Sequence, residues 1–145
     1  RRQERATSLA EKLNKESPNK VTGVQATTLE EVGKAIAEAD VVMAAGSAGI
    51  QLLSLEVLKN YGERCKVVAD VNAVPPVGVE NLDSQGDGVE VVQGVYGVGA
   101  LAIGALKNKV EAKLLTKAME SPKGVFDYKT GYQLAKEYVY KKLGK

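Results

Sequence analysis

Residues 67–78 constrain the fold of this chain more than any other segment. The apolar run at 66–71 predicts a short buried strand. It ends in Asp70, Asn72 and the consecutive prolines Pro75 and Pro76, where neither a helix nor a hydrogen-bonded ladder continues easily. A strand that ends in polar side chains on a rigid loop is typical of open α/β sheets, whose ligands lie outside the carboxyl ends of the strands. We therefore expect a ligand beside this loop.

The composition limits the chemistry that is open to the chain. Its 145 residues are 44% hydrophobic and 26% charged, as in an ordinary globular domain, and its net charge of +2 gives no argument for nucleic acid or a membrane surface. No apolar run is long enough to span a bilayer, and the single Cys65 suits the reducing cytoplasm. Histidine is absent, which excludes Ser-His and Cys-His catalysis and, with one cysteine, removes most zinc sites, so we name no metal ligands. An enzyme of this composition is expected to use an organic cofactor.

Predicted strands and helices alternate along the chain. The apolar runs predict strands at 21–26, 40–45, 66–71 and 89–93, and periodic patterns predict helices at 3–15, 28–39, 54–61 and 128–143, with a long helix between the glycines at 94–104 and residue 121. Thr28 and Glu31 form a predicted capping box, and Asp127 is a predicted N-cap. In the last helix we expect a buried stripe of Tyr132, Ala135 and Val139. The alternation predicts an α/β fold with a mostly parallel sheet.

The first predicted helix begins almost at Arg1, with no strand ahead of it. Parallel sheets of this kind normally open with a strand and a phosphate-binding turn. We therefore expect the chain to be the later part of a longer protein.

Two glycine-rich turns imitate dinucleotide fingerprints. Residues 97–102 match G-x-G-x-x-A between a strand and a helix, but no acidic strand end follows about 20 residues later to bind a ribose. Residues 46–49 precede a helix and a strand that ends in Asp70, but the glycine spacing is wrong. We favour packing turns or close approach to a ligand over a pyrophosphate cradle, which stays open as the alternative. If neither turn is a pyrophosphate cradle, two roles stay open for Asp70: it binds a ligand, or it braces its own loop.

Three arginines stand at the start of the first helix: Arg1, Arg2 and Arg5. Cations at a helix N-terminus oppose the helix dipole, so the cluster makes sense if an anion binds there. An arginine at such a place suits the 2′-phosphate of NADP. The alternative is a solvated helix start.

Four strings, taken together and in order, carry a family resemblance: 43–53, 68–78, 97–107 and 124–127. The most specific is D-x-N-A-x-P-P, from Asp70 to Pro76. With them the chain resembles the NAD(P)-dependent methylene-tetrahydromethanopterin dehydrogenases, a family that includes users of methylene-tetrahydrofolate. The resemblance implies a Rossmann-like doubly wound sheet without its first strands. Residues 1–145 would be the NAD(P)-binding domain, and the substrate domain and first Gly-rich loop would lie upstream of Arg1.

The resemblance also implies roles for residues. Arg1, Arg2 and Arg5 would bind the 2′-phosphate, which favours NADP over NAD as the cofactor. The residues along the cofactor and near its nicotinamide would be Ala45, Gly46, Ser47, Asn72, Pro75, Pro76, Gly97 and Gly99. Lys107 is the one candidate for a catalytic side chain, and a solvated lysine on a basic helix is the alternative reading.

The reaction implied is hydride transfer from a reduced pterin, through its methylene bridge, to NADP. The methenyl product is a stabilised cation, so no general base is required, which suits a chain without histidine. The resemblance implies a homo-oligomer, and the single cysteine favours a cytoplasmic location. Two alternatives remain open: another NADP dehydrogenase of the shikimate or quinate type, and a non-catalytic nucleotide-binding domain.

Overall fold

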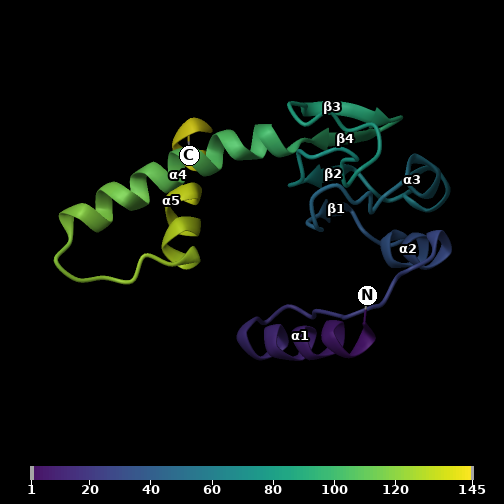
Figure 1. Ribbon diagram of the computed structural model, residues 1–145, viewed down its shortest axis with the longest axis horizontal. Helices are drawn as coiled ribbons and strands as arrows, with labels where there is room; N and C mark the ends of the chain where they lie inside the picture. Colours follow the sequence, from purple (N-terminus) through teal and green to yellow (C-terminus); the bar gives the residue numbers. More distant parts are fainter. Residues whose placement is uncertain (1, 145) are drawn as a thin grey trace.

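A four-stranded sheet lies at the centre of the structure, a computed structural model that describes residues 2–144. Its strands are β1 (Val41–Ala44), β2 (Val67–Asp70), β3 (Asp87–Val92) and β4 (Val95–Val98), in the order β1-β2-β4-β3 (Figure 1). β1, β2 and β4 are parallel, and β3 is antiparallel to β4. The prediction of an α/β fold with a mostly parallel sheet is confirmed.

The antiparallel hairpin of β3 and β4 is absent from the sequence-based prediction. The sequence predicts a single strand at 89–93, followed directly by a glycine-rich turn into a helix. Gly94 instead adopts a positive φ of 76° between the two strands, a conformation that glycine reaches at little cost. The chain turns back there, and residues 95–98 form the strand that pairs with β2.

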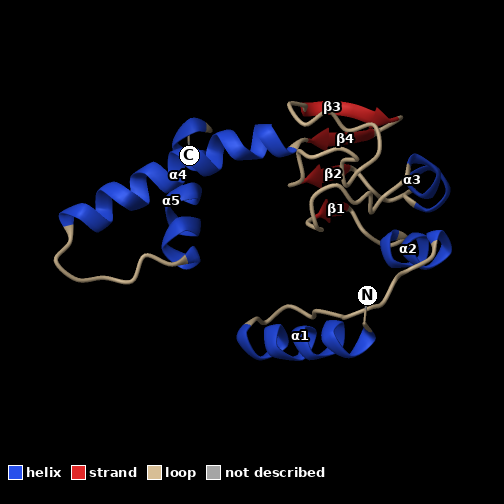
Figure 2. Ribbon diagram, in the orientation of Figure 1, coloured by secondary structure: helices blue, strands red, loops and turns tan. Residues whose placement is uncertain are grey.

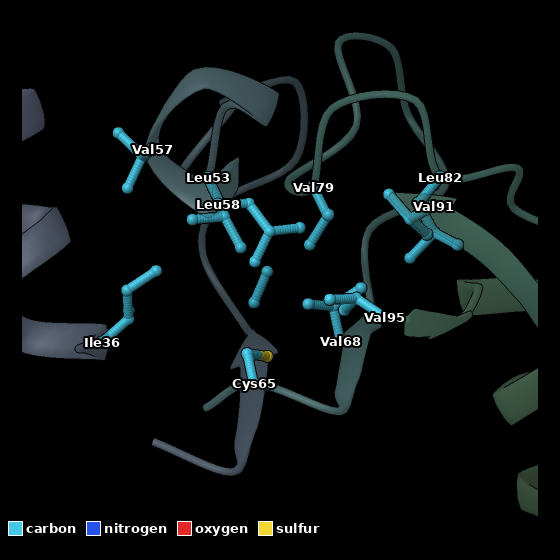
Figure 3. Packing of buried hydrophobic residues seen from close by; sticks show 11 residues of the cluster. Ile36, Leu53, Val57, Leu58, Cys65, Val68, Val79, Leu82, Val91 and Val95 are labelled. Atoms are coloured by element: carbon cyan, nitrogen blue, oxygen red, sulfur yellow. The ribbon is translucent and has the colours of Figure 1, made fainter. Parts of the chain in front are cut away.

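Helices α2 (Leu29–Ile36) and α3 (Leu55–Tyr61) supply the apolar core on one side of the sheet. Val57 and Leu58 of α3 are almost fully buried, as are Val68 of β2 and Val79 of the loop after it (Figure 3). The predicted capping box at Thr28 is confirmed, because its hydroxyl accepts from the Glu31 amide while the Glu31 carboxylate accepts from the Thr28 amide.

The opposite face of the sheet is exposed among the described residues. Val41 and Tyr96 are 60% and 50% exposed and occupy equivalent positions on either side of β2, and Met43 is 63% exposed. Parallel sheets normally have both faces covered. A doubly wound arrangement therefore stays a prediction.

Helix α1 (Gln3–Glu16) packs against the extended segment 21–26, which runs back along it (Figure 2). The Gln3 side chain bonds the amide of Gln25 and the carbonyl of Gly23, and the Asn14 side chain bonds both backbone groups of Val21. The prediction of a strand at 21–26 is wrong, since the segment pairs with no strand. Side chains of α1, in place of a neighbouring strand, satisfy its peptide groups.

Helices α4 (Ala100–Glu120) and α5 (Tyr128–Lys142) form a hairpin, here called the arm, that projects from the end of β4 (Figure 1). Asp127 caps α5 as predicted, because its carboxylate accepts from the amides of Lys129 and Thr130. The predicted buried stripe is partly wrong: Tyr132 is exposed, and the buried residue of α5 is Leu134. No helix in the described part of the chain is long and apolar enough to cross a membrane.

Charge is divided unequally between these parts. The sheet and its loops, residues 17–99, carry eleven acidic and five basic side chains. The arm and the two residues after it, 100–144, carry nine lysines and four acidic side chains. The small net charge of the chain therefore conceals an acidic sheet unit joined to a basic arm.

Candidate functional site

The three parallel strands end side by side at one edge of the sheet, here called the carboxyl edge. β1 ends at Ala44, β2 at Asp70 and β4 at Val98. Ala44 pairs with Asp70, and Val98 pairs with the preceding residue of β2. Ligands of open α/β sheets bind at such an edge. The structure thus brings together the loops that follow these strands, residues 45–53 and 71–79, with the turn at Gly99.

The loop after β1 is exposed at this edge. Ala45, Gly46 and Ser47, all predicted to lie along a cofactor, are exposed to solvent. The amides of Leu52 and Leu53 donate to the carbonyl of Gly78 at 2.8 and 2.9 Å, which joins this loop to the one after β2. The two loops consequently form one surface next to the ends of β1 and β2.

Asp70 is a structural residue of the carboxyl edge. Its side chain is only 2% exposed, and its two carboxylate oxygens accept from the amides of Asn72 at 2.9 Å and Val79 at 3.1 Å. A methyl group added at Gly78 would lie 2.8 Å from the same carboxylate, so the loop passes very close to it. Of the two roles considered for Asp70, the bracing of its own loop is the one that these contacts support.

Asn72 also acts on the loop that contains it. Its amide nitrogen donates to the carbonyls of Val74 and Pro76, and its oxygen accepts from the amide of Val74 at 3.0 Å. The side chain is 7% exposed, whereas Pro75 and Pro76 present their surfaces to solvent. Asn72 therefore shapes a loop on which the two prolines are accessible, and contact of all three with a nicotinamide stays a prediction.

Gly97 and Gly99 are surrounded by protein atoms. A methyl group at Gly97 would meet the side chains of Leu82 and Val91 at 2.5 and 2.6 Å, and one at Gly99 would overlap the backbone of residues 83 and 84. The Gly99 amide donates to the carbonyl of Gly86. The amide of residue 101, in the first turn of α4, donates to the carbonyl of residue 84 at 2.7 Å. Close packing accounts for both glycines, and their contact with a cofactor stays a prediction.

The remaining predicted residues lie outside this group. Lys107 is exposed on α4, with its ammonium 3.5 Å from the carboxylate of Glu111 one turn later. Arg2 and Arg5 are exposed at the start of α1, which lies apart from the sheet in Figure 1, and Arg1 falls outside the described residues. The structure does not bring these cations to the carboxyl edge.

A cleft between the sheet and the arm is a feature that the sequence-based reasoning missed. It encloses about 360 Å³ and is lined from β3, β4, α4 and α5, including Asp87, Val98, Leu106 and Lys109. The Lys109 ammonium donates to the hydroxyl of Tyr138 at 2.8 Å. This hydrogen bond and the positive charge lower the pKa of Tyr138. No local motif joins residues so distant in sequence, so only the folded chain reveals the cleft.

Within residues 2–144, His, Cys, Asp and Glu side chains form no group of three that could hold an ion. The polar groups of the carboxyl edge are backbone groups, the exposed hydroxyl of Ser47, and the buried side chains of Asp70 and Asn72, which are bonded to their own loop. The groups of this edge that stay accessible to a ligand are the exposed backbone and the Ser47 hydroxyl.

Comparison with known proteins identifies two relatives in Methylorubrum extorquens, whereas no family model matches the chain. The bifunctional protein MdtA is 35% identical over 137 residues, which is 94% of this chain and 47% of the relative. An NAD(P)-dependent methylenetetrahydromethanopterin dehydrogenase is 35% identical over 119 residues, which is 81% of this chain and 40% of the relative. The chain thus spans about half the length of the curated relatives it matches.

Proposed function

The chain is homologous, over most of its length, to an NAD(P)-dependent methylenetetrahydromethanopterin dehydrogenase, and from this premise we propose that it is the cofactor-binding part of such an enzyme. The proposed reaction transfers a hydride from methylene-tetrahydromethanopterin or methylene-tetrahydrofolate to NADP. Residues 1–145 would form one NAD(P)-binding domain within a doubly wound fold, and the substrate domain and the first Gly-rich loop would come from sequence outside the chain. Association into a homo-oligomer is part of the same proposal.

The observation that carries this proposal is the 35% identity that extends over 137 residues. It includes the three parallel strands and the loops after them, not one isolated motif. These loops lie at the carboxyl edge, where cofactors of open α/β sheets bind. The shared sequence therefore includes the carboxyl edge, and we propose this edge as the place where the cofactor binds.

The exposed residues at the carboxyl edge are compatible with NADP. Ala45, Gly46 and Ser47 offer accessible backbone and a hydroxyl after β1, and we assign them to the cofactor. Arg2 and Arg5 are exposed guanidinium groups of the type that binds a 2′-phosphate, and would act there once α1 is placed against the cofactor. When bound, NADP supplies the hydride acceptor.

The contribution of the chain is to hold and orient flat rings. The loop after β2 is braced through Asp70 and Asn72, so Pro75 and Pro76 can form a fixed wall beside a nicotinamide. A rigid wall keeps donor and acceptor carbons at reactive distance and displaces water. Lys107, which follows Leu106 on α4, is proposed to lie near the substrate, and no residue needs to remove a proton because the methenyl product is itself a stabilised cation.

Absorbance of NADPH tests the proposal directly. The protein is mixed with NADP+ and methylene-tetrahydromethanopterin, and separately with methylene-tetrahydrofolate. We expect NADPH to form with at least one of them. NADP+ binding without NADPH from either substrate would instead support the non-catalytic nucleotide-binding alternative, and reduction with shikimate or quinate would support the other dehydrogenase class.

A further inference from the structure

The cleft between the sheet and the arm, here called the arm cleft, is a second candidate ligand site. It opens at the carboxyl end of β4, the same edge of the sheet that carries the candidate cofactor loops. Its volume of about 360 Å³ falls within the range of small-molecule pockets. Asp87 and Val98 line it from the sheet, and the remaining lining residues come from the arm.

The walls of the arm cleft are apolar. They consist of Val98 of β4, Ala102, Ile103, Ala105 and Leu106 of α4, and Val139 of α5. Aliphatic walls from two helices and a strand suit a flat ring, whose faces need contact and no hydrogen bonds. Polar groups are confined to Asp87 on the sheet side and to three residues on the arm side.

The sheet side of the arm cleft offers an acceptor. Asp87 is exposed at the start of β3, and within residues 2–144 its carboxylate takes part in no hydrogen bond or ion pair. A carboxylate pairs well with two parallel N–H donors, as in its bidentate pairs with arginine. The 2-amino group and N3–H of a reduced pterin form such a pair of donors.

The arm side of the cleft offers donors and positive charge. Lys109 of α4 donates to the hydroxyl of Tyr138, and its ammonium also lies 5.1 Å from the centre of that ring. Lys142, one turn further along α5, lines the same cleft. Two lysines beside a phenol favour an anionic group, because each ammonium can donate to a carboxylate or phosphate.

We propose that the arm cleft binds the reduced pterin, with Asp87 on the 2-amino and N3–H edge, the apolar walls on the ring, and Lys109 and Lys142 on the acidic tail. The inference rests on the proposed function and names where on this chain its substrate would bind. A cleft beside α3 also combines an acceptor, apolar side chains and two lysines, but it lies at the start of β2, away from the candidate cofactor loops. The arm cleft has this combination at the carboxyl edge.

The acidic tail is tested with tetrahydrofolate carrying one or three glutamates. Titration calorimetry without NADP gives the dissociation constant of each. We expect the triglutamate to bind about tenfold more tightly, the effect of an added charge-assisted contact, and Lys142→Ala to bring this ratio close to one. Lys141→Ala is the matched control, because it removes the same charge from the neighbouring residue, which does not line the cleft. Equal ratios in the two variants would overturn the assignment of the tail.

The pterin edge is tested with Asp87→Asn. This substitution keeps the size of the side chain but replaces one acceptor with a donor, and we expect binding of both tetrahydrofolates to weaken by about tenfold. Asp87 is exposed, so the fold should persist, and circular dichroism of the variant checks this. Unchanged affinity in the folded variant, or no binding of tetrahydrofolate by the unaltered protein, would overturn the proposal.

The experiments distinguish an error in the assignment of the pterin to the arm cleft from an error in the proposed function. If NADPH forms at an unchanged substrate KM in Asp87→Asn and Lys142→Ala, the dehydrogenase proposal stands and the arm cleft is wrong. If tetrahydrofolate binds as expected but no NADPH forms, the arm cleft stands and the reaction is wrong.

Discussion

Asp70 and Asn72 fix the loop after β2 through side-chain bonds to its own backbone. Both are buried polar residues, a combination that costs free energy unless every polar atom is bonded. Residues 2–144 contain no buried side-chain nitrogen or oxygen without a hydrogen-bond partner, so that requirement is met here. Asp70 and Asn72 therefore act on the loop itself, and the two prolines that follow them are left accessible.

Replacement of the Asp70 carboxylate should destabilise the fold. In Asp70→Asn the new NH2 group faces an amide donor, which leaves one buried N–H without an acceptor. We expect a loss of about 1–3 kcal/mol in the free energy of unfolding, measured by urea denaturation. Glu63→Gln, at an exposed position on the same sheet unit, is the control and should change the free energy by less than about 0.5 kcal/mol. A similar small change for both variants would show that Asp70 does not brace the loop.

Helix α2 should make the stability dependent on pH through its capping box. Hydrogen bonds from Thr27 and Thr28 lower the pKa of Glu31 from 4.5 to about 2. Because the pKa is lower in the folded chain, the stabilisation by ionised Glu31 is complete above pH 4.5 and is lost as the pH falls towards 2. The expected result is a lower thermal midpoint across this window.

The variant Glu31→Gln isolates that contribution. It cannot ionise, so the midpoint difference between it and the unaltered chain should shrink as the pH falls through the same window. Glu16→Gln, at the end of α1, controls for the loss of a negative charge. A difference that does not depend on pH would contradict the role of the ionised Glu31.

The contact between α1 and segment 21–26 depends on a glycine. A methyl group at Gly23 would overlap the carbonyl of Ala6, so Gly23→Ala should separate the segment from α1. We expect faster proteolysis within residues 17–27 of the variant. Gly104→Ala is the matched control, because nothing lies within 4 Å of that position in α4, and it should stabilise the helix by about 0.5–1 kcal/mol. Equal proteolysis of the two variants would contradict the contact.

Elements with local signals could be predicted from the sequence, and elements that depend on distant partners could not. Thr28 and Asp127 mark the starts of helices by bonds within a few residues, and the structure has helices that begin after these positions. Segment 21–26 has the apolar pattern of a strand, but pairing is decided by a neighbour that lies elsewhere in the chain. β4 was missed because its glycines resemble a turn, although Gly97 is required by the packing of Leu82 and Val91.

The candidate site also has features that could be predicted from local sequence and features that could not. The carboxyl edge could be predicted, since the end of an apolar run is visible in the sequence. The separate roles of its residues could not be predicted, because the hydrogen bonds that define the roles of Asp70 and Asn72 are visible only in the structure. The arm cleft depends on how α5 returns along α4, which no pattern of residues near Lys109 or Tyr138 indicates.

At the scale of the whole molecule, the apolar core is concentrated in one part. The core cluster extends from Ile36 to Val95, whereas α1 has one buried residue, α5 has one and α4 has none. Regions with few buried contacts open at lower free energy than the core. Three parts of the molecule, namely α1, the sheet with α2 and α3, and the arm, are therefore expected to differ in local stability.

Hydrogen exchange read by mass spectrometry should resolve these parts. We expect amides of β2 and α3 to exchange slowest, and those of α1 and of the arm tip near residue 120 to exchange much faster, without a single cooperative transition for the whole chain. The exchange pattern with NADP+ added is a useful comparison, because slower exchange in α1 would place its arginines on the cofactor. Uniform protection of all three parts would contradict this description.

The unequal division of charge has a practical consequence for handling the protein. A sequence pI of about 8.6 suggests retention on cation exchangers alone. The nine lysines of residues 100–144 and the eleven acidic residues of 17–99, of which Asp70 is buried, instead belong to separate parts of the molecule, because the arm projects from the sheet (Figure 1). Each part can meet a resin of opposite sign, so we expect the protein at neutral pH and low salt to bind both cation and anion exchange columns. Chromatographic behaviour would then report the shape of this molecule more faithfully than its net charge does.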